Sequence, residues 1–78
     1  SRAVKPQQRT PQNVTLSERE IEALSWSARG KTSGEIATIL GLSKRTVDFH
    51  IDRAREKLGV ATRVEAVVRA ATEGFIKP

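Results

Sequence analysis

The sequence predicts an all-α fold: a four-helix bundle with a central helix-turn-helix. Three observations support this prediction. A Ser or Thr followed three residues later by Glu marks helix starts, glycines mark helix ends, and apolar residues recur three and four positions apart between them. No stretch alternates apolar and polar residues convincingly enough for a strand, and no β-hairpin signal is present.

The first helix is expected over 17–29 and the second over 32–40. Each begins with a capping box, in which the hydroxyl and the carboxylate each accept the other residue's backbone N–H. The two boxes are Ser17 with Glu20 and Thr32 with Glu35. The expected end glycines and apolar faces are Gly30 with Ile21 and Leu24, then Gly41 with Ile36, Ala37 and Leu40.

The third helix is expected over 43–58 and the fourth over 62–73. Ser43 suits the third start, although Thr46 stands where a capping box would have Glu. Thr62 and Glu65 form a complete box for the fourth. The expected end glycines and apolar faces are Gly59 with Val47, Ile51, Ala54 and Leu58, then Gly74 with Ala66, Val67 and Ala70.

Composition favours a binding module over an enzyme. The 78 residues are 37% hydrophobic and 29% charged, with no run long enough to span a membrane. There is no cysteine, and the single histidine, His50, cannot build a His-rich metal site. We therefore expect no catalytic residue, no metal, no cofactor and no membrane partner.

The basic charge is unevenly distributed along the chain. Residues 1–15 carry Arg2, Lys5 and Arg9 without an acid, which is +3 of the net +5. With two prolines and few apolar residues, 1–15 is expected to be a flexible linker or arm, and 16–78 the folded domain. The chain does not begin with Met, so an upstream sensory or regulatory domain is expected to be missing from it.

Segment 33–52 fits a helix-turn-helix. Ala37 is small enough for two helices to cross closely, Gly41 permits a left-handed turn, and Val47 returns an apolar side chain to the first helix. Leu42 is expected to fill the corner. At about 100° per residue, the third helix turns the polar side chains away from its apolar face, and the start of that outer face is the part that would enter a major groove.

A set of motifs covering about 16–76 resembles the LuxR/GerE-type DNA-binding domain. These motifs are Leu16-Ser17-Glu18-Arg19-Glu20, Ala28-Arg29-Gly30-Lys31-Thr32-Ser33, Glu35-Ile36-Ala37, Leu40, Ser43, Thr46-Val47, His50, Lys57-Leu58-Gly59-Val60 and Arg63-Val64-Glu65-Ala66-Val67. Trp26, the Gly-Lys-Thr-Ser run and Phe49 resemble the acyl-homoserine-lactone receptor branch of that family. The resemblance implies a dimeric DNA-binding domain with its third helix in the major groove.

The candidate DNA-binding residues lie at the starts of the second and third helices and on the outer face of the third. They are Lys31, Thr32, Ser43, Lys44, Arg45, Thr46, Asp48, Phe49, Asp52, Arg53 and Lys57. We expect Lys44, Arg53 and Lys57 to contact phosphates and Arg45 to reach a base.

Three of these candidates leave alternatives open. Asp48 and Asp52 depart from the family, which often has Lys, Arg or Asn at these two positions. One alternative is that the two carboxylates accept a hydrogen bond from the amino group of a cytosine. The other is that they orient Arg45 and Arg55 by pairing with them along the helix. Phe49 either contacts DNA or covers the first helix. Trp26 is expected to be structural, at the junction of helix and linker.

The fourth helix carries a second apolar stripe beside its core face, made of Val64, Val68 and Ala71. Two stripes on a terminal helix exceed what a small core uses. We expect a two-fold homodimer through this stripe, where the family dimerises.

The sequence thus predicts the sequence-specific DNA-binding domain of a cytoplasmic bacterial transcription regulator, of the quorum-sensing LuxR type. Its partner would be a dyad-symmetric operator in double-stranded DNA, and the missing upstream domain would sense an acyl-homoserine lactone. The alternatives are the output domain of a two-component response regulator and a helical protein-interaction module that never touches DNA.

Overall fold

The structure is a computed structural model that describes residues 14–77. This part of the chain forms four helices and no strand, as predicted. They are α1 (Glu18–Ala28), α2 (Ser33–Leu40), α3 (Lys44–Leu58) and α4 (Arg63–Thr72). None of these helices is long and apolar enough to cross a membrane.

Every helix begins at the cap that the sequence predicted. Ser17, Thr32 and Thr62 form complete capping boxes with the Glu three residues on. At α3 the Ser43 hydroxyl accepts the backbone N–H of Thr46 at 3.1 Å and donates to the Thr46 hydroxyl at 2.9 Å, so the Thr hydroxyl binds the cap side chain and not, as a Glu would, its backbone N–H. Local hydrogen bonding therefore fixes all four starts.

The turn between α2 and α3 has the expected glycine corner. Gly41 closes α2 with φ of 70°, in the left-handed region that favours glycine. The N–H groups of Gly41 and Leu42 both bind the carbonyl of Ala37, the latter at 2.9 Å. Leu42 packs against the core beneath the corner. The prediction of a helix-turn-helix is confirmed.

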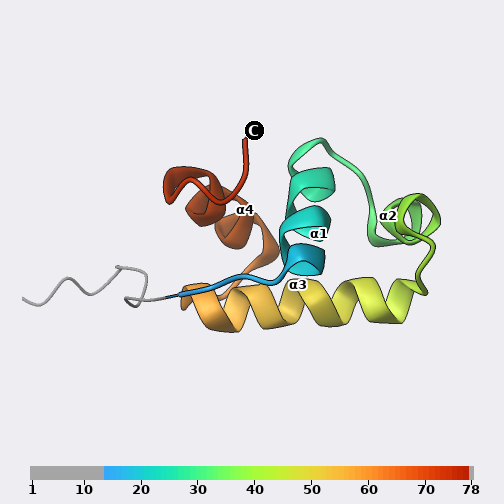
Figure 1. The fold of residues 1–78 in the computed structure, drawn as a ribbon, viewed down its shortest axis with the longest axis horizontal. Helices are drawn as coiled ribbons and strands as arrows, with labels where there is room; N and C mark the ends of the chain where they lie inside the picture. Colours follow the sequence, from blue (N-terminus) through green and yellow to red (C-terminus); the bar gives the residue numbers. More distant parts are fainter. Residues whose placement is uncertain (1–13, 78) are drawn as a thin grey trace, which may run out of the picture.

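α3 is the central element, and each of the other three helices packs against it. Figure 1 shows α3 along one edge of the bundle, with α1, α2 and α4 all on the same side of it. Its four predicted core residues are buried and serve two clusters. Around its first half lie Ala23, Ile36, Ala37, Val47 and Ile51; around its second half lie Leu16, Leu24, Ala54, Leu58, Ala66, Ala70 and Ile76.

Packing of the described chain begins slightly before the expected domain boundary. Val14 lies against the second cluster, Leu16 is buried in it, and the exposed Thr15 between them binds Lys57 through its carbonyl, so contacts with the bundle begin at Val14. The rest of the expected arm, 1–13, lies outside the described residues.

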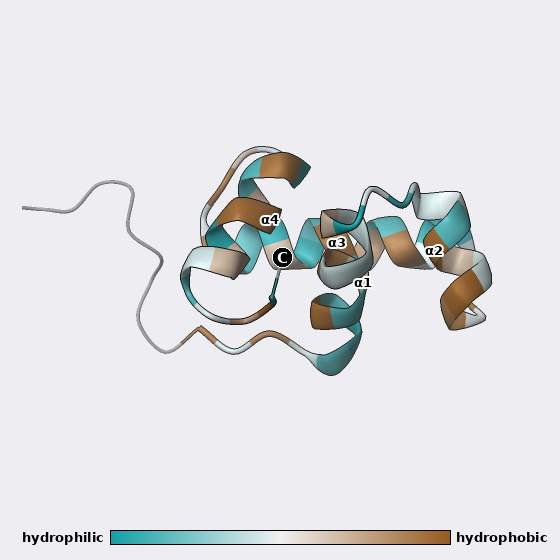
Figure 2. Cartoon of the chain, turned by 90° about the horizontal axis from the view of Figure 1, so that it is seen from above, coloured by the Kyte–Doolittle hydropathy of each residue, from teal (hydrophilic) through white to brown (hydrophobic). Residues whose placement is uncertain are grey.

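Viewed from above, hydrophobic and hydrophilic residues alternate in bands along α3, as an amphipathic helix requires (Figure 2).

Candidate nucleic-acid interface

The outer face of α3 is open along its length. Arg45, Phe49, Asp52 and Arg53 are exposed, while Thr46 and Asp48 are half-buried on its flanks. The other three helices lie on the opposite side of α3 (Figure 1). The described chain therefore leaves the outer face of α3 uncovered, as a helix that enters a major groove requires.

The starts of two helices, α2 and α3, lie beside this outer face. Lys31 and Thr32 precede α2, and Ser43 and Lys44 stand at the beginning of α3; all four are exposed. The first N–H groups of a helix and its dipole favour an anion such as a phosphate. The Thr32 N–H binds the Glu35 carboxylate at 2.9 Å and holds the pKa of that carboxyl below its ordinary value, so the cap is well formed.

Most charges on α3 are already paired. Three pairs form along the helix: Lys44 with Asp48 at 3.2 Å, Arg55 with Asp52 at 2.9 Å, and Arg53 with Glu56 at 3.3 Å. Lys57 is paired with a residue of α1. Among the described residues, Arg45 is therefore the one cation of α3 whose charge no acid offsets, and it stands in the first turn.

The two acids of the outer face differ in their partners. Asp52 binds Arg55, so pairing along the helix is confirmed there. Asp48 binds Lys44 and not Arg45, so of the two alternatives left open for Asp48, pairing with Arg45 is wrong, and an acceptor role toward cytosine stays a prediction. The Ser33 hydroxyl, followed by Lys44 and Arg63, holds the pKa of Asp48 below its ordinary value despite partial burial. Asp48 is thus a carboxylate acceptor at neutral pH.

The aromatic side chains also occupy different environments. Phe49 is 57% exposed, with its ring edge-on to His50 at 5.8 Å between centroids. This exposure disfavours the alternative in which the ring covers the first helix, and the alternative of a DNA contact stays a prediction. Trp26 is half-buried against the first core cluster, and the Arg29 guanidinium lies 5.3 Å from its ring centroid. Trp26 is structural as expected, although it packs against the core cluster that contains residues of α1 and α2 and not at the junction with the linker.

Lys57 has a tertiary partner that sequence reasoning missed. Its ammonium donates to the Glu20 carboxylate at 2.9 Å and to the Thr15 carbonyl at 3.2 Å. Glu20 is only 4% exposed, so the acid of this pair is largely removed from water, while the Lys57 side chain stays 31% exposed. The pair fastens the segment leading into α1 onto the last turns of α3. Local sequence spacing does not predict this ion pair, because the two residues are 37 positions apart.

Arg63 is a second missed residue. Its guanidinium donates to the hydroxyls of Ser27 and Ser33, at 2.8 and 2.7 Å, and to the carbonyl of Lys31 at 3.2 Å. One side chain at the start of α4 thereby holds the end of α1 and the start of α2. The loop that carries Lys31 and Thr32 is positioned by this contact.

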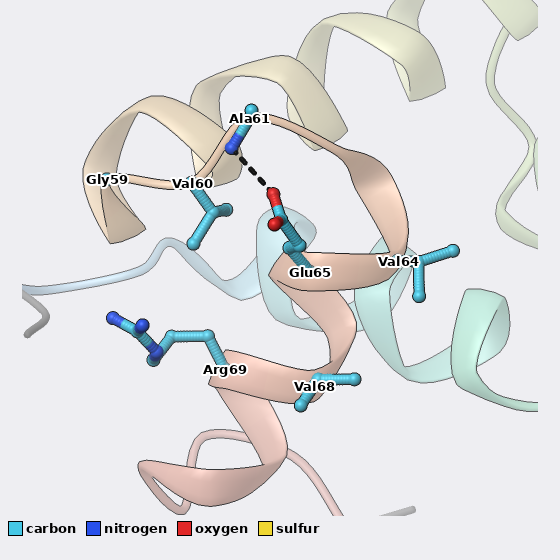
Figure 3. Close-up of a pocket in the computed structure, with 7 residues that line it drawn as sticks. All are labelled: Gly59, Val60, Ala61, Val64, Glu65, Val68 and Arg69. Carbon is cyan, nitrogen blue, oxygen red and sulfur yellow. Dashed lines mark hydrogen bonds between the residues drawn. The ribbon is translucent and has the colours of Figure 1, made fainter. Parts of the chain in front are cut away.

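The candidate dimer residues divide into two kinds. Val64 and Val68 are 71% and 59% exposed, whereas Ala71 is half-buried against the second core cluster. Figure 3 shows the two valines on one side of α4 and Arg69 on the other, around an open pocket of about 400 Å³. The pocket is completed by Gly59, Val60, Ala61 and Glu65.

Sequence comparison associates the chain with regulators of transcription. A family model described as bacterial regulatory proteins, luxR family, matches residues 14–70. The transcriptional activator protein AnoR of Acinetobacter nosocomialis is 47% identical over 64 residues, which are 82% of this chain and 27% of that protein. The HTH-type quorum sensing-dependent transcriptional regulator RpaR of Rhodopseudomonas palustris is 48% identical over 62 residues, 80% of this chain and 26% of RpaR.

Structural comparison gives the same association. The structure of the transcription factor GerE superposes with a TM-score of 0.77 at 31% identity, covering 80% of this chain and 92% of GerE. The chain spans about a quarter of the length of the two curated relatives named above. The likeness therefore concerns one domain of those longer proteins.

Proposed function

Because this chain belongs to the luxR family of bacterial regulatory proteins, as a DNA-binding domain, we propose that two copies bind one dyad-symmetric operator. Each copy lays α3 in a major groove of double-stranded DNA, with the two grooves about one duplex turn apart. The domain performs no catalysis; it reads sequence for a transcription regulator.

One observation carries this proposal: the first turn of α3 is exposed and holds Arg45, a cation with no acidic partner within residues 14–77, while Val47 and Ile51 are buried beneath it. A cation that is not neutralised by a neighbouring acid is available to a phosphate or to a guanine edge. Its position at the helix start matches the part of a recognition helix that reaches base edges.

The remaining contacts follow from where the side chains lie. Lys31 and Thr32 at the start of α2, Ser43 and Lys44 at the start of α3, and Arg53 on its outer face bind phosphates. The Lys44–Asp48 pair is exposed on both sides, so Lys44 can exchange it for a phosphate at little cost. Base edges are then left to Arg45, Thr46, Asp48, Phe49 and Asp52.

Dimerisation is proposed through Val64 and Val68, with Ala71 at the edge of the contact. The two valines form an exposed apolar patch that a second copy would cover. An isolated domain with few phosphate contacts binds DNA weakly, and pairing two half-sites raises the affinity of the whole.

The regulatory setting is proposed from the relatives. RpaR is named as quorum sensing-dependent, and it extends well beyond the aligned segment. We propose that this domain likewise belongs to a longer cytoplasmic regulator whose sensory domain binds an acyl-homoserine lactone. A response-regulator output domain would bind DNA with the same surface, but the names of the relatives favour quorum sensing. A protein-interaction module without DNA binding is disfavoured by the family.

The direct test is selection of binding sites from random duplex DNA with this domain. We expect the recovered sequences to contain two half-sites related by dyad symmetry. Binding should weaken steeply as salt rises, because each phosphate contact releases bound counterions. A variant with Lys44 and Arg45 both changed to Ala should lose the recovered preference. Recovery of random sequence by the unaltered domain would contradict the proposal.

A further inference from the structure

The loop that joins α1 to α2 is held by hydrogen bonds from two sides. The backbone N–H of Lys31 donates to the carbonyl of Trp26 at 3.1 Å, and the Lys31 carbonyl accepts from the Arg63 guanidinium at 3.2 Å. Trp26 is itself packed against the first core cluster. Both backbone groups of Lys31 are therefore tied to the bundle, one to α1 and the other to α4.

The Arg63 side chain binds more than this one carbonyl. It also donates to the Ser27 hydroxyl on α1 at 2.8 Å and to the Ser33 hydroxyl on α2 at 2.7 Å. Ser33 is only 6% exposed, so its end of the bond is largely removed from water. All three nitrogens of the guanidinium are used, and its planar fork fixes the direction of each bond. A lysine at this position would keep the charge without reproducing the fork.

The side chain of Lys31, unlike its backbone, is not held. Lys31 is exposed, and among residues 14–77 its ammonium makes no hydrogen bond and no ion pair. After the Thr32 N–H, its charge helps to lower the pKa of the Glu35 carboxyl, but only at a distance. Lys31 thus combines a fixed backbone with an available cation. Such a residue loses little backbone conformational entropy when its ammonium binds a phosphate.

We infer that Arg63 is a positioning residue for a phosphate contact made by Lys31: by holding the Lys31 carbonyl and Ser33 from α4, it presents the Lys31 ammonium to the DNA backbone beside α3. The inference rests on the proposed DNA binding of α3. It adds that one phosphate contact of each copy depends on a side chain of α4, the helix that also carries the proposed dimer contact. Arg63 does this without touching DNA.

The first experiment is a double-mutant cycle of Lys31→Ala and Arg63→Lys, read as affinity for the selected DNA site over a range of salt concentrations. Lys31→Ala should weaken binding by about tenfold at about 0.1 M salt and lower the slope of log affinity against log salt by about one, because one phosphate contact is lost. Arg63→Lys keeps the net charge and should still weaken binding severalfold. With Arg63→Lys present, Lys31→Ala should cost less than about threefold, because the contact that it removes is already impaired.

Two controls accompany this cycle. Arg53, on the outer face of α3, is proposed to bind a different phosphate, and its side chain pairs with Glu56 and not with any partner of Arg63. Arg53→Ala should therefore cost the same affinity in the parent and in Arg63→Lys. Arg19→Lys makes the same substitution in an exposed pair within α1 and should leave both affinity and salt slope unchanged.

The second experiment needs no DNA. NMR relaxation of the backbone amides measures how rigid the loop is in the free domain. The amides of Lys31 and Thr32 should have order parameters of about 0.85, as in rigid backbone, and Arg63→Lys should lower them while the amides of α3 stay unchanged. Arg19→Lys should change neither. If Arg63→Lys fails to fold, Ser27→Ala carries both experiments, because it removes one of the three bonds and places a good helix former in α1.

The outcomes separate the two proposals. If the unaltered domain selects no DNA sequence, the proposed function fails and this inference fails with it. If binding is selective but Lys31→Ala leaves the salt slope unchanged, Lys31 makes no phosphate contact and only the inference is overturned. Equal costs of Lys31→Ala with and without Arg63→Lys also overturn it, since Arg63 then acts independently of Lys31. So does a loop whose order parameters neither Arg63→Lys nor Ser27→Ala changes.

Discussion

At the scale of single residues, two cations of one helix illustrate how chemically similar side chains serve different ends. Arg45 stands in the first turn of α3, exposed and without an acidic partner among the described residues. Lys57, in the last turn, is committed to the buried carboxylate of Glu20 and to the Thr15 carbonyl. The first is available to DNA, while the second stabilises the fold. A phosphate contact by Lys57 stays a prediction.

Replacing Arg45 by Ala should weaken operator binding by about tenfold, the energy of one good contact to a base edge or phosphate. Thermal stability should stay unchanged, since no partner is left behind. Lys57→Ala is the contrasting variant. It should lower the melting temperature, because it leaves Glu20 buried and unpaired. Gel-shift titration and thermal unfolding monitored by circular dichroism measure the two effects. Equal loss of stability in both variants would contradict the distinction.

Glu20 should also make stability depend on pH. Burial tends to raise the pKa of its carboxyl, but the Ser17 N–H and the Lys57 ammonium outweigh burial and hold the pKa below its ordinary value. Its contribution is therefore present above the unfolded pKa of about 4.3 and is lost as pH falls through the lower folded value. Glu20→Gln should cost about 2 kcal/mol at pH 7.

This difference in free energy of unfolding between the parent and Glu20→Gln should shrink from about pH 5 downward, as measured by urea unfolding. Glu18→Gln is the control, because Glu18 is an exposed acid of the same helix turn. It changes the net charge equally and should cost little at any pH. A cost of Glu20→Gln that stays constant down to pH 3 would contradict the assigned role of the carboxylate.

At the scale of elements, helix boundaries depend on capping groups and on two kinds of glycine. Gly41 ends α2 in the left-handed region, with open space around the place where a Cβ would lie. Gly34 lies within α2, where a Cβ would meet only the Thr32 hydroxyl at an ordinary 3.9 Å. The first glycine is required by backbone conformation, whereas the second is not required by the fold of the domain.

The two glycines should respond oppositely to the same substitution. Gly41→Ala should destabilise the domain by about 1 kcal/mol, because an Ala in the left-handed region is strained. Gly34→Ala should stabilise it by roughly 0.5 to 1 kcal/mol, because Ala has less conformational freedom to lose in a helix. Urea unfolding at constant pH measures both. A loss of stability in Gly34→Ala would show that this position tolerates only glycine.

At the scale of the whole molecule, the two core clusters meet on α3, and three helices cover one side of it. This arrangement leaves two surfaces of different character. The outer face of α3 is charged, and the Val64 and Val68 patch on α4 is apolar. Arg63 links α4, which carries the valine patch, to the start of α2 beside α3, because it begins α4 and binds Ser33 and the carbonyl of Lys31.

Val68→Glu should abolish cooperative binding to an operator with two half-sites, since it buries a charge at the proposed dimer contact. Affinity for a single half-site should fall by less than about threefold, because the site on α3 is untouched. Gel shifts on one-site and two-site duplexes measure this. Lys77→Gln, an exposed residue past α4, changes the net charge by the same amount and is the control. Equal losses on both duplexes would argue against the dimer.

The sequence by itself determined the four helices, their caps and the outward face of α3. Each of these depends on residues three to six apart, which capping chemistry and the helical period relate directly. The alternation of buried Val47 and Ile51 with exposed Arg45 and Phe49 follows from that period alone.

Only the tertiary structure decided which polar groups meet between helices. Lys57 reaches Glu20, and Arg63 reaches Ser27 and Ser33, across 30 to 37 positions of sequence. Those contacts depend on how the helices cross, which is set by the packing of many side chains together, and no local spacing encodes it. For that reason the partners of Lys57 and Arg63 emerged only when the helices were assembled.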